Sequence, residues 1–163
     1  MIKKPFSRAH AGLLAVAALA PSLAAAVSPA LVIKAAVLRE ERVAAADGST
    51  ATRLVAPTRV TTGDRLVYQL SYRNSGTAPA TGVVIAYPVP EHLQYAGAAT
   101  PSAAPELSVD GKTFGPLPTL LVRGPGGTSR PAQAADVRVV RWRLSRPVAA
   151  GGEGTVAFRA LLK

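Results

Sequence analysis

Cysteine is absent from this chain of 163 residues, and aromatic residues make up only 5% of it. No disulfide can therefore hold the fold, and no thiolate can bind a metal or act as a nucleophile. Beyond residue 26 there is one histidine, His92, whereas a zinc site needs three or four ligands. We interpret His92 as an exposed loop residue, and we predict a non-enzymatic protein without catalytic, cofactor-binding or metal-binding residues.

Acidic residues are also few, and they occur at turns. Asp47 and Asp110 each precede a glycine, Asp64 follows one, and Asp136 lies at a strand entry. Asp accepts hydrogen bonds from nearby backbone N–H groups, so this placement favours a role in turns over the paired carboxylates of glycoside chemistry. The predicted turn residues are Asp47, Gly48, Gly63, Asp64, Asn74, Gly76, Asp110 and Gly111.

The first 26 residues have the pattern of a signal peptide. "MIKK" and Arg8 supply positive charge, "AGLLAVAALAPSLAAA" is apolar, and 24–26 fit the small-residue rule for cleavage after Ala26. The alternative is an uncleaved membrane anchor, because no charge lies between Arg8 and Lys34, although Pro21 and Pro29 interrupt the run. We expect export to the periplasm or the exterior, which leaves 163 − 26 = 137 residues, enough for one core.

Positive charge exceeds negative charge, with 19 Lys and Arg against 9 Asp and Glu. Removing the three cations of the leader leaves 16 − 9 = +7. Nucleic-acid binding favours clustered cations with aromatic residues between them, but most of these cations stand singly between apolar residues. The tightest group is "RVVRWRLSR", 138–146, which we interpret as a solvated strand face. We therefore predict no nucleic-acid partner.

Apolar and polar residues alternate at period two, which indicates half-buried β-strands. The alternation is clearest over 66–73, 140–145 and 156–162, and shorter strands are expected at 83–87, 93–96, 106–109 and 120–123. Many short strands with Gly and Pro turns predict an all-β antiparallel sandwich. The predicted core is Leu66, Tyr68, Leu70, Tyr72, Val83, Ile85, Val140, Trp142, Leu144, Val156 and Phe158.

Two further regions of the sequence complete the predicted fold. Residues 27–56 are expected to form a strand or hairpin that packs on or extends the sandwich of 57–163, with strands at 31–45 and 51–56 around Asp47-Gly48. Segment 31–45 could pair within the chain or with a neighbour. Residues 123–136, with three glycines and two prolines, are expected to form the longest flexible loop.

Residues 60–99, "VTTGDRLVYQLSYRNSGTAPATGVVIAYPVPEHLQYAGAA", resemble the bacterial domain of unknown function number eleven. The shared motifs are the Gly-Asp turn, the strand ending in Asn, the Gly-Thr-Ala-Pro-Ala loop and the proline-closed strand. The later "VVRWRLSRPVAAGGEGTVAFRALL" also fits. Tyr87 stands where the family usually has Asp. The resemblance implies an immunoglobulin-like sandwich of seven to eight strands in an exported, single-copy member, and it implies no activity.

Two classes of function fit these features. The first is a non-catalytic structural or protein-interaction module of the bacterial cell envelope, with fibre assembly by strand donation from 31–37 as a variant. The second is a module that binds carbohydrate or envelope polymer through a basic strand face. The residues considered for an interaction surface are Tyr87, Tyr95, Arg138, Arg141 and Arg143. The oligomeric state is left open, and membrane contact is expected only through an uncleaved leader.

Asn74 is the only asparagine in the chain. Asn tolerates left-handed φ and bonds its own backbone, so we interpret Asn74 as the turn between two strands rather than as a site residue. It is no glycosylation acceptor, because Gly76 stands where Ser or Thr is needed. Loss of one capping bond in Asn74→Ala is expected to cost about 1 kcal/mol.

Overall fold

The computed structural model describes residues 31–45, 47–100 and 102–163, so the predicted signal peptide lies outside the described residues. The described chain is all-β, and its helical segments are the three short 3-10 helices η1 (Leu117–Thr119), η2 (Pro125–Gly127) and η3 (Ala134–Asp136). Within these ranges no helix is long and apolar enough to cross a membrane. The strands are β1 (Leu31–Ala44), β2 (Thr50–Val55), β3 (Arg65–Asn74), β4 (Val84–Pro88), β5 (Leu93–Ala98), β6 (Glu106–Ser108), β7 (Leu121–Arg123), β8 (Ser129–Pro131), β9 (Val139–Arg143) and β10 (Glu153–Leu162).

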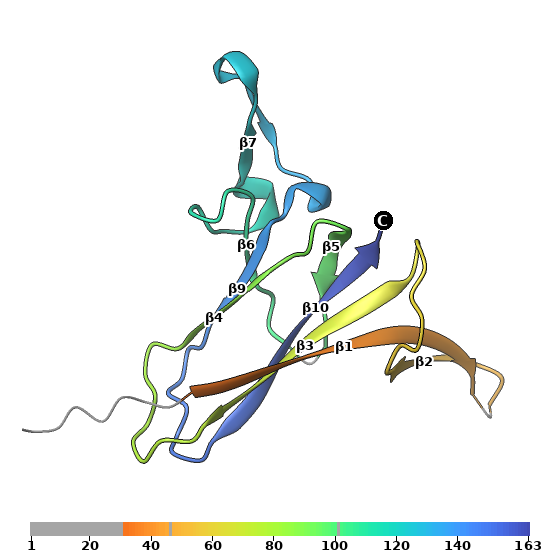
Figure 1. Ribbon diagram of the computed structural model, residues 1–163, viewed down its shortest axis with the longest axis vertical. Helices are drawn as coiled ribbons and strands as arrows, with labels where there is room; N and C mark the ends of the chain where they lie inside the picture. The colour runs from red at the N-terminus through yellow and green to blue at the C-terminus, as the bar shows by residue number, and fades with distance from the viewer. Residues whose placement is uncertain (1–30, 46, 101) are drawn as a thin grey trace, which may run out of the picture.

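Five strands form one antiparallel sheet in the order β2-β1-β3-β10-β5. The long strand β1 pairs on one edge with β3, from Leu31 to Arg39, and on the opposite edge with β2, from Arg39 to Ala44. The hairpin expected within 27–56 is therefore confirmed, and it extends the sheet of the main body (Figure 1). Within this chain, the first part of β1 takes β3 as its partner.

The second sheet has three antiparallel strands in the order β4-β9-β6. Side chains of both sheets share one core, with Leu70 and Phe158 from the first sheet and Ile85, Val140 and Trp142 from the second. This arrangement is consistent with the predicted β-sandwich. The two sheets hold 5 + 3 = 8 strands of the described chain, and β7 and β8 form a separate arm that projects away from them (Figure 1).

Phe158 on β10 lies at the centre of the core and is fully buried. Four aromatic rings surround it at centroid distances of 5.2 to 6.3 Å: Tyr68, Trp142, Tyr87 and Tyr95. The indole Nε1 of Trp142 donates to the carbonyl oxygen of Ala103 at 3.0 Å, so its polar edge is satisfied. Nine of the predicted core residues are buried, while Tyr72 and Leu144 are half-buried at the margin.

The outer face of the larger sheet is less polar than strict alternation predicts. A small second cluster lies there, made of Val67, Ala99, Ala157 and, at its margin, Leu38. Arg159 lies beside it and donates through Nε to the Glu40 carboxylate at 2.6 Å. Both faces of the two central strands are therefore partly covered, which explains why Val67 is only 2% exposed.

The Asn74 side chain is 0% exposed and links three segments of the chain. Its amide nitrogen donates to the carbonyl oxygens of Ala78 at 2.8 Å and Val148 at 2.9 Å, and its amide oxygen accepts from the Gly76 N–H at 3.0 Å. The first and last of these partners lie in the β3–β4 connection, and Val148 lies in the β9–β10 connection. The amide thus ties the end of β3 to both turns at this end of the sandwich.

The backbone of Asn74 is also paired. Its N–H donates to the Gly152 carbonyl oxygen at 2.9 Å, and its carbonyl oxygen accepts from the Gly151 N–H at 2.8 Å. The residue therefore belongs to the end of β3, and no non-glycine residue of the described chain has a positive φ. The expected left-handed turn is wrong at this position, because the buried side chain rather than the backbone conformation makes the corner.

The predicted Asp-Gly turns are present. Gly48, Gly63 and Gly111 have φ of +80°, +93° and +74°, the region that glycine enters without steric cost. Asp47 accepts from the Ser49 N–H at 2.9 Å, and Asp64 accepts from that of Thr61 at 2.8 Å. These aspartates stabilise turns, as their positions in the sequence predict.

Asn74→Ala should lower the free energy of unfolding by about 2–4 kcal/mol, more than the loss of one bond, because the three partner groups would lose a buried partner. Asn74→Asp should also destabilise, since a carboxylate cannot donate to the two carbonyl oxygens. Urea unfolding followed by Trp142 fluorescence measures both changes. A loss of about 1 kcal/mol or less in both variants would contradict the three-way link.

Phe158→Ala should cost about 3–5 kcal/mol, because it opens a cavity among four aromatic rings. The matched control is Phe114→Ala, which removes a half-buried ring that contacts Arg141, and it should cost about 1 kcal/mol. Equal losses in the two variants, measured by urea unfolding, would show that Phe158 is not the centre of the core.

Candidate functional site

The two tyrosines considered for an interaction surface belong to the core. Tyr95 is 8% exposed, and burial raises the pKa of its phenol. Tyr87 is half-buried, with its ring 5.6 Å from Tyr68 and 6.1 Å from Phe158. The expectation that Tyr95 lies on a binding rim is wrong, and Tyr87 faces the same aromatic cluster. Their sequence positions beside proline-closed turns could not show that the two sheets meet over them.

The basic residues of β9 do face outward, but an acid neutralises part of their charge. In the register of the smaller sheet, Glu106 on β6 lies opposite Arg141 on β9. Its carboxylate accepts from Arg141 Nε at 2.7 Å and lies 3.4 Å from Arg143 Nε. The Arg141 hydrogen bond holds the pKa of Glu106 below its usual value. The Arg141 guanidinium also lies 3.6 Å from the centroid of the Phe114 ring.

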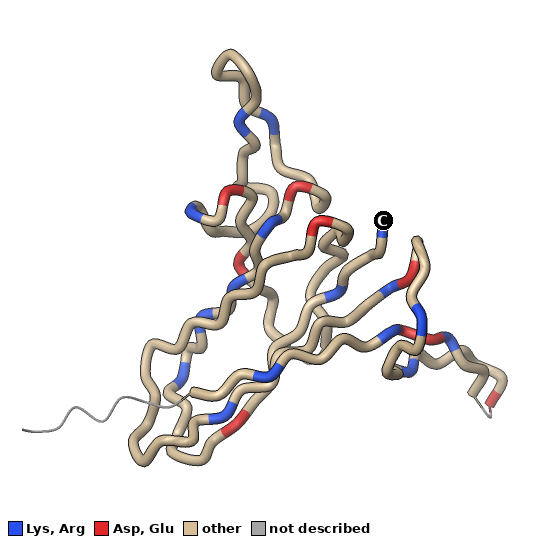
Figure 2. Tube along the Cα trace, in the orientation of Figure 1, with Lys and Arg blue, Asp and Glu red and all other residues tan. Residues whose placement is uncertain are grey.

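The remaining cations do not gather into one patch. Figure 2 shows Lys and Arg spread along the whole described trace, several of them beside Asp or Glu. Arg138 is exposed just before β9, and its backbone N–H donates to the Ser108 carbonyl oxygen at 2.8 Å. Arg143 and Arg146 are exposed as well, whereas Arg141 is half-buried between Glu106 and Phe114, so only part of 138–146 is a solvated face.

The region expected to be the longest flexible loop is a structured arm instead. β7 and β8 pair in register, and the turn between them uses positive φ at Gly126 and Gly127. Arg130 on β8 makes two bonds of 2.7 Å to the Asp136 carboxylate, which also accepts from the Gln133 N–H. The expected loop is wrong here because "GPGG" forms the turn of a hairpin, whose two strands β7 and β8 pair with each other.

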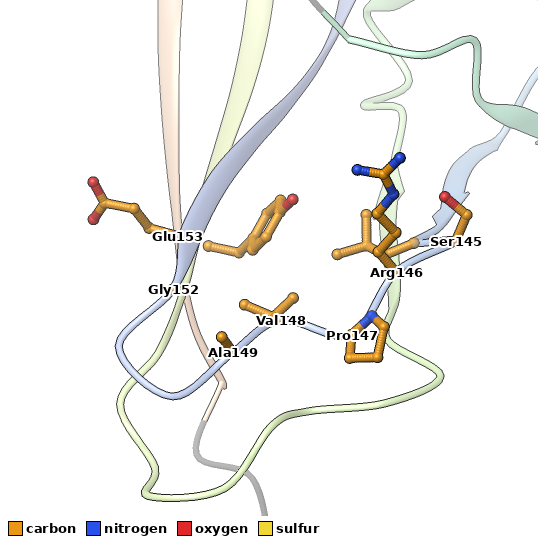
Figure 3. Close-up of a pocket in the computed structure, with 9 residues that line it drawn as sticks. Ser145, Arg146, Pro147, Val148, Ala149, Gly152 and Glu153 are labelled. Carbon is orange, nitrogen blue, oxygen red and sulfur yellow. The ribbon is translucent and has the colours of Figure 1, made fainter.

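A small hollow of about 280 Å³ opens between the sheets near the β9–β10 connection (Figure 3). Tyr72, Leu144 and Arg146 line it, together with Glu153 at the start of β10. Figure 3 shows the Glu153 carboxylate directed away from Arg146, so the charged groups do not converge on one point. The hollow is a shallow margin of the core, where Tyr72 covers the backbone of Gly154.

No group of three or more potential metal ligands occurs among residues 31–45, 47–100 and 102–163. His92 is exposed in the turn before β5, as expected, and its carbonyl oxygen accepts from the Lys163 N–H at 3.0 Å. Asp110 accepts from the N–H groups of Lys112 and Thr113, both at 2.8 Å, and these bonds lower its pKa. Backbone or arginine partners thus engage the carboxylates of Asp47, Asp64, Asp110, Asp136 and Glu106.

The most distinctive surface is a stretch of β1 that pairs with another described strand on one side only. Residues 31–38, here called the open edge, pair with β3 on one side, while β2 reaches only as far as Arg39 on the other. Residues 32–36 are exposed, and Val32 and Ile33 each keep 46% of their accessible surface. A single charge, Lys34, lies within this apolar run.

The backbone groups that point out of the open edge follow from the alternation of a strand. The N–H of Ala45, just after β1, donates to the Ser49 carbonyl oxygen at 2.8 Å, on the side where β2 lies. The backbone N–H and C=O groups of the odd-numbered residues of β1 therefore point to that side. On β3, the backbone groups of Asn74 bond Gly151 and Gly152 on the β10 side, so those of its neighbour Arg73 point to β1. Arg73 lies opposite Val32, and the even-numbered residues of β1 therefore point to β3. Both ends agree, so the N–H and C=O groups of Leu31, Ile33, Ala35 and Val37 point out of the open edge, where no other strand of the described residues pairs with them.

Other sheet edges carry features that oppose strand addition. β6 is three residues long, β4 ends in Pro88, and three of the six residues of β2 are polar, namely Thr50, Thr52 and Arg53. β5 has an irregular register against β10 between Arg159 and Ala160. The open edge has only Lys34 as protection, and this difference makes it the candidate functional site. Its apolar character is visible in the sequence, but its free side is not.

No protein-family model matches this chain, and no curated protein or solved structure is significantly similar to it. Membership of the family that 60–99 resembles therefore stays a prediction.

Acid should weaken the arm through Asp136. The Arg130 and Gln133 bonds lower its folded-state pKa to about 2. Because the unfolded carboxyl titrates at about 4, this contribution to stability is present above about pH 4 and is lost as the pH falls toward about 2. Asp136→Asn should lower the urea midpoint near neutral pH and reduce the further fall on acidification, whereas an unchanged acid response would contradict the assignment.

Proposed function

We propose that this chain is a non-catalytic interaction module of the bacterial cell envelope, which binds a protein partner through the open edge. An extended segment of the partner would add to the sheet beside β1, with main-chain hydrogen bonds to Ile33, Ala35 and Val37. The single observation that carries the proposal is the apolar stretch at residues 31–38, which is exposed at 32–36 and which, among the described residues, pairs on one side only because β2 stops at Arg39.

Export and the finer fold belong to the same proposal. The pattern of residues 1–26 supports a cleaved leader and a periplasmic or extracellular location. The two antiparallel sheets around one core, together with the motifs of 60–99, support an immunoglobulin-like module. The aspartates at turns support a non-catalytic role, because their oxygens are bonded to local backbone groups.

The two alternatives have weaker support. Binding of an envelope polymer would use the outward face of β9, but Glu106 already pairs with Arg141 and Arg143 there. Fibre assembly by strand donation would require 31–37 to leave β3, with which this segment is fully paired. Addition of a strand to the open edge leaves all of these contacts in place.

Two adjacent alanines provide a matched test. Ala35→Pro removes an N–H that points out of the open edge, whereas Ala36→Pro removes one that faces β3. We expect Ala35→Pro to retain most of the thermal stability and to lose partner binding. Ala36→Pro should lower the melting temperature clearly, because it breaks the pairing of β1 with β3.

Binding is measured in the producing cell with a photo-cross-linking amino acid in place of Ile33, and with the same group in place of Leu121 on the arm as a control. A protein adduct at Ile33 that disappears in the Ala35→Pro background supports the proposal. Adducts that are absent, or equally strong at Leu121 and in the Ala35→Pro background, would overturn it.

A further inference from the structure

The length of the open edge limits what can bind there. Pairing along the outer side of β1 can begin at Leu31 and must stop where β2 occupies Arg39. A second strand therefore finds room for about seven or eight residues, a usual strand length. Its hydrogen bonds must come from the odd-numbered residues between these limits.

Side chains of the open edge are apolar on both faces of the sheet. Ile33 and Val37 lie opposite Tyr72 and Tyr68 of β3, so they point to the core side. Val32 lies opposite Arg73 and points to the outer side, where Leu38 joins the second cluster. A strand that pairs here would gain contacts only if it is also apolar on both faces.

The open edge itself meets this requirement. We propose that a second copy of this chain pairs with it, β1 against β1 in antiparallel orientation, about a twofold axis at Ala35. Ile33 then lies opposite Val37 of the second copy on the core side, and Val32 lies opposite Leu38 of the second copy on the outer side. Both exposed apolar residues of the edge acquire apolar neighbours, and the two five-stranded sheets become one.

Lys34 selects this register over its neighbour. With the axis at Ala35, Lys34 lies opposite Ala36 of the second copy, and no like charges face each other. A shift of the axis by one residue would place Lys34 directly opposite itself, which is destabilising. A shift of the axis by one residue in the other direction would place Ile33 of the second copy opposite Arg39. The backbone groups of Arg39 on that side already pair with β2. The central register keeps Ile33, Ala35 and Val37 of both copies paired.

This inference rests on the proposed use of the open edge and names its occupant. The chain has no cysteine, so single-cysteine variants report on one position each. Ala35→Cys places two thiols opposite each other across the twofold axis, and a short bismaleimide should link most of the protein into covalent dimers. Leu121→Cys, which is 59% exposed on the arm, should remain largely unlinked at the same concentration.

Sedimentation velocity of the purified protein, produced from the full chain, should show a species with twice the mass of one copy at a protein concentration of about 100 µM. Ala35→Pro should raise the dimer Kd at least about tenfold, because it removes the hydrogen bonds at the centre of the interface. A monomeric wild-type protein, or equal cross-linking of Ala35→Cys and Leu121→Cys, would overturn the inference.

The outcomes separate this inference from the proposed function. An adduct at Ile33 with twice the mass of the chain, lost in Ala35→Pro, supports both. An adduct at Ile33 with a different protein, in a wild-type chain that is monomeric, overturns pairing between copies and leaves the proposed function standing. The absence of any adduct that depends on the Ala35 N–H overturns both.

Discussion

The buried amide of Asn74 is the interaction on which the rest of the structure depends. A polar side chain with no exposed surface is costly unless each of its donors and acceptors has a partner, and here all are used. Its partners lie in the two connections that cross between the sheets, at Ala78 and Val148. Without a disulfide, this amide and the rings around Phe158 hold the two sheets together.

The open edge is a consequence of the unequal sheets. The three-stranded sheet is too narrow to cover one whole face of the five-stranded sheet. The exposed side chains at residues 32–36 of β1 lie beyond the part that it covers. The strand stays in place because residues 31–39 pair with β3, while β2 covers its other edge only from Arg39 to Ala44. The same pairing that stabilises the hairpin therefore leaves residues 31–38 with free backbone groups and exposed apolar side chains, the combination that strand addition requires.

The charged and aromatic residues illustrate how far sequence patterns identify a surface. Outward placement of Arg141 and Arg143 follows from alternation, yet the acid that pairs with them, Glu106 on β6, lies 35 residues before Arg141 in the chain. Tyr95 stands beside a turn in the sequence and packs against Phe158 in the fold. Local patterns assign the face of a strand, but the neighbours of that face come from strands distant in the chain.

The sequence by itself determined the all-β class, most of the core, the hairpin around Asp47-Gly48 and the turn roles of its aspartates, because strand period and turn chemistry are local. Only the tertiary structure decided the pairing of β1 with β3, the burial of Tyr95 and Asn74, and the ordered arm at β7 and β8. Each depends on strand order and register, which arise from contacts between segments far apart in sequence. The open edge combines both, since its apolar run is local and its missing neighbour is not.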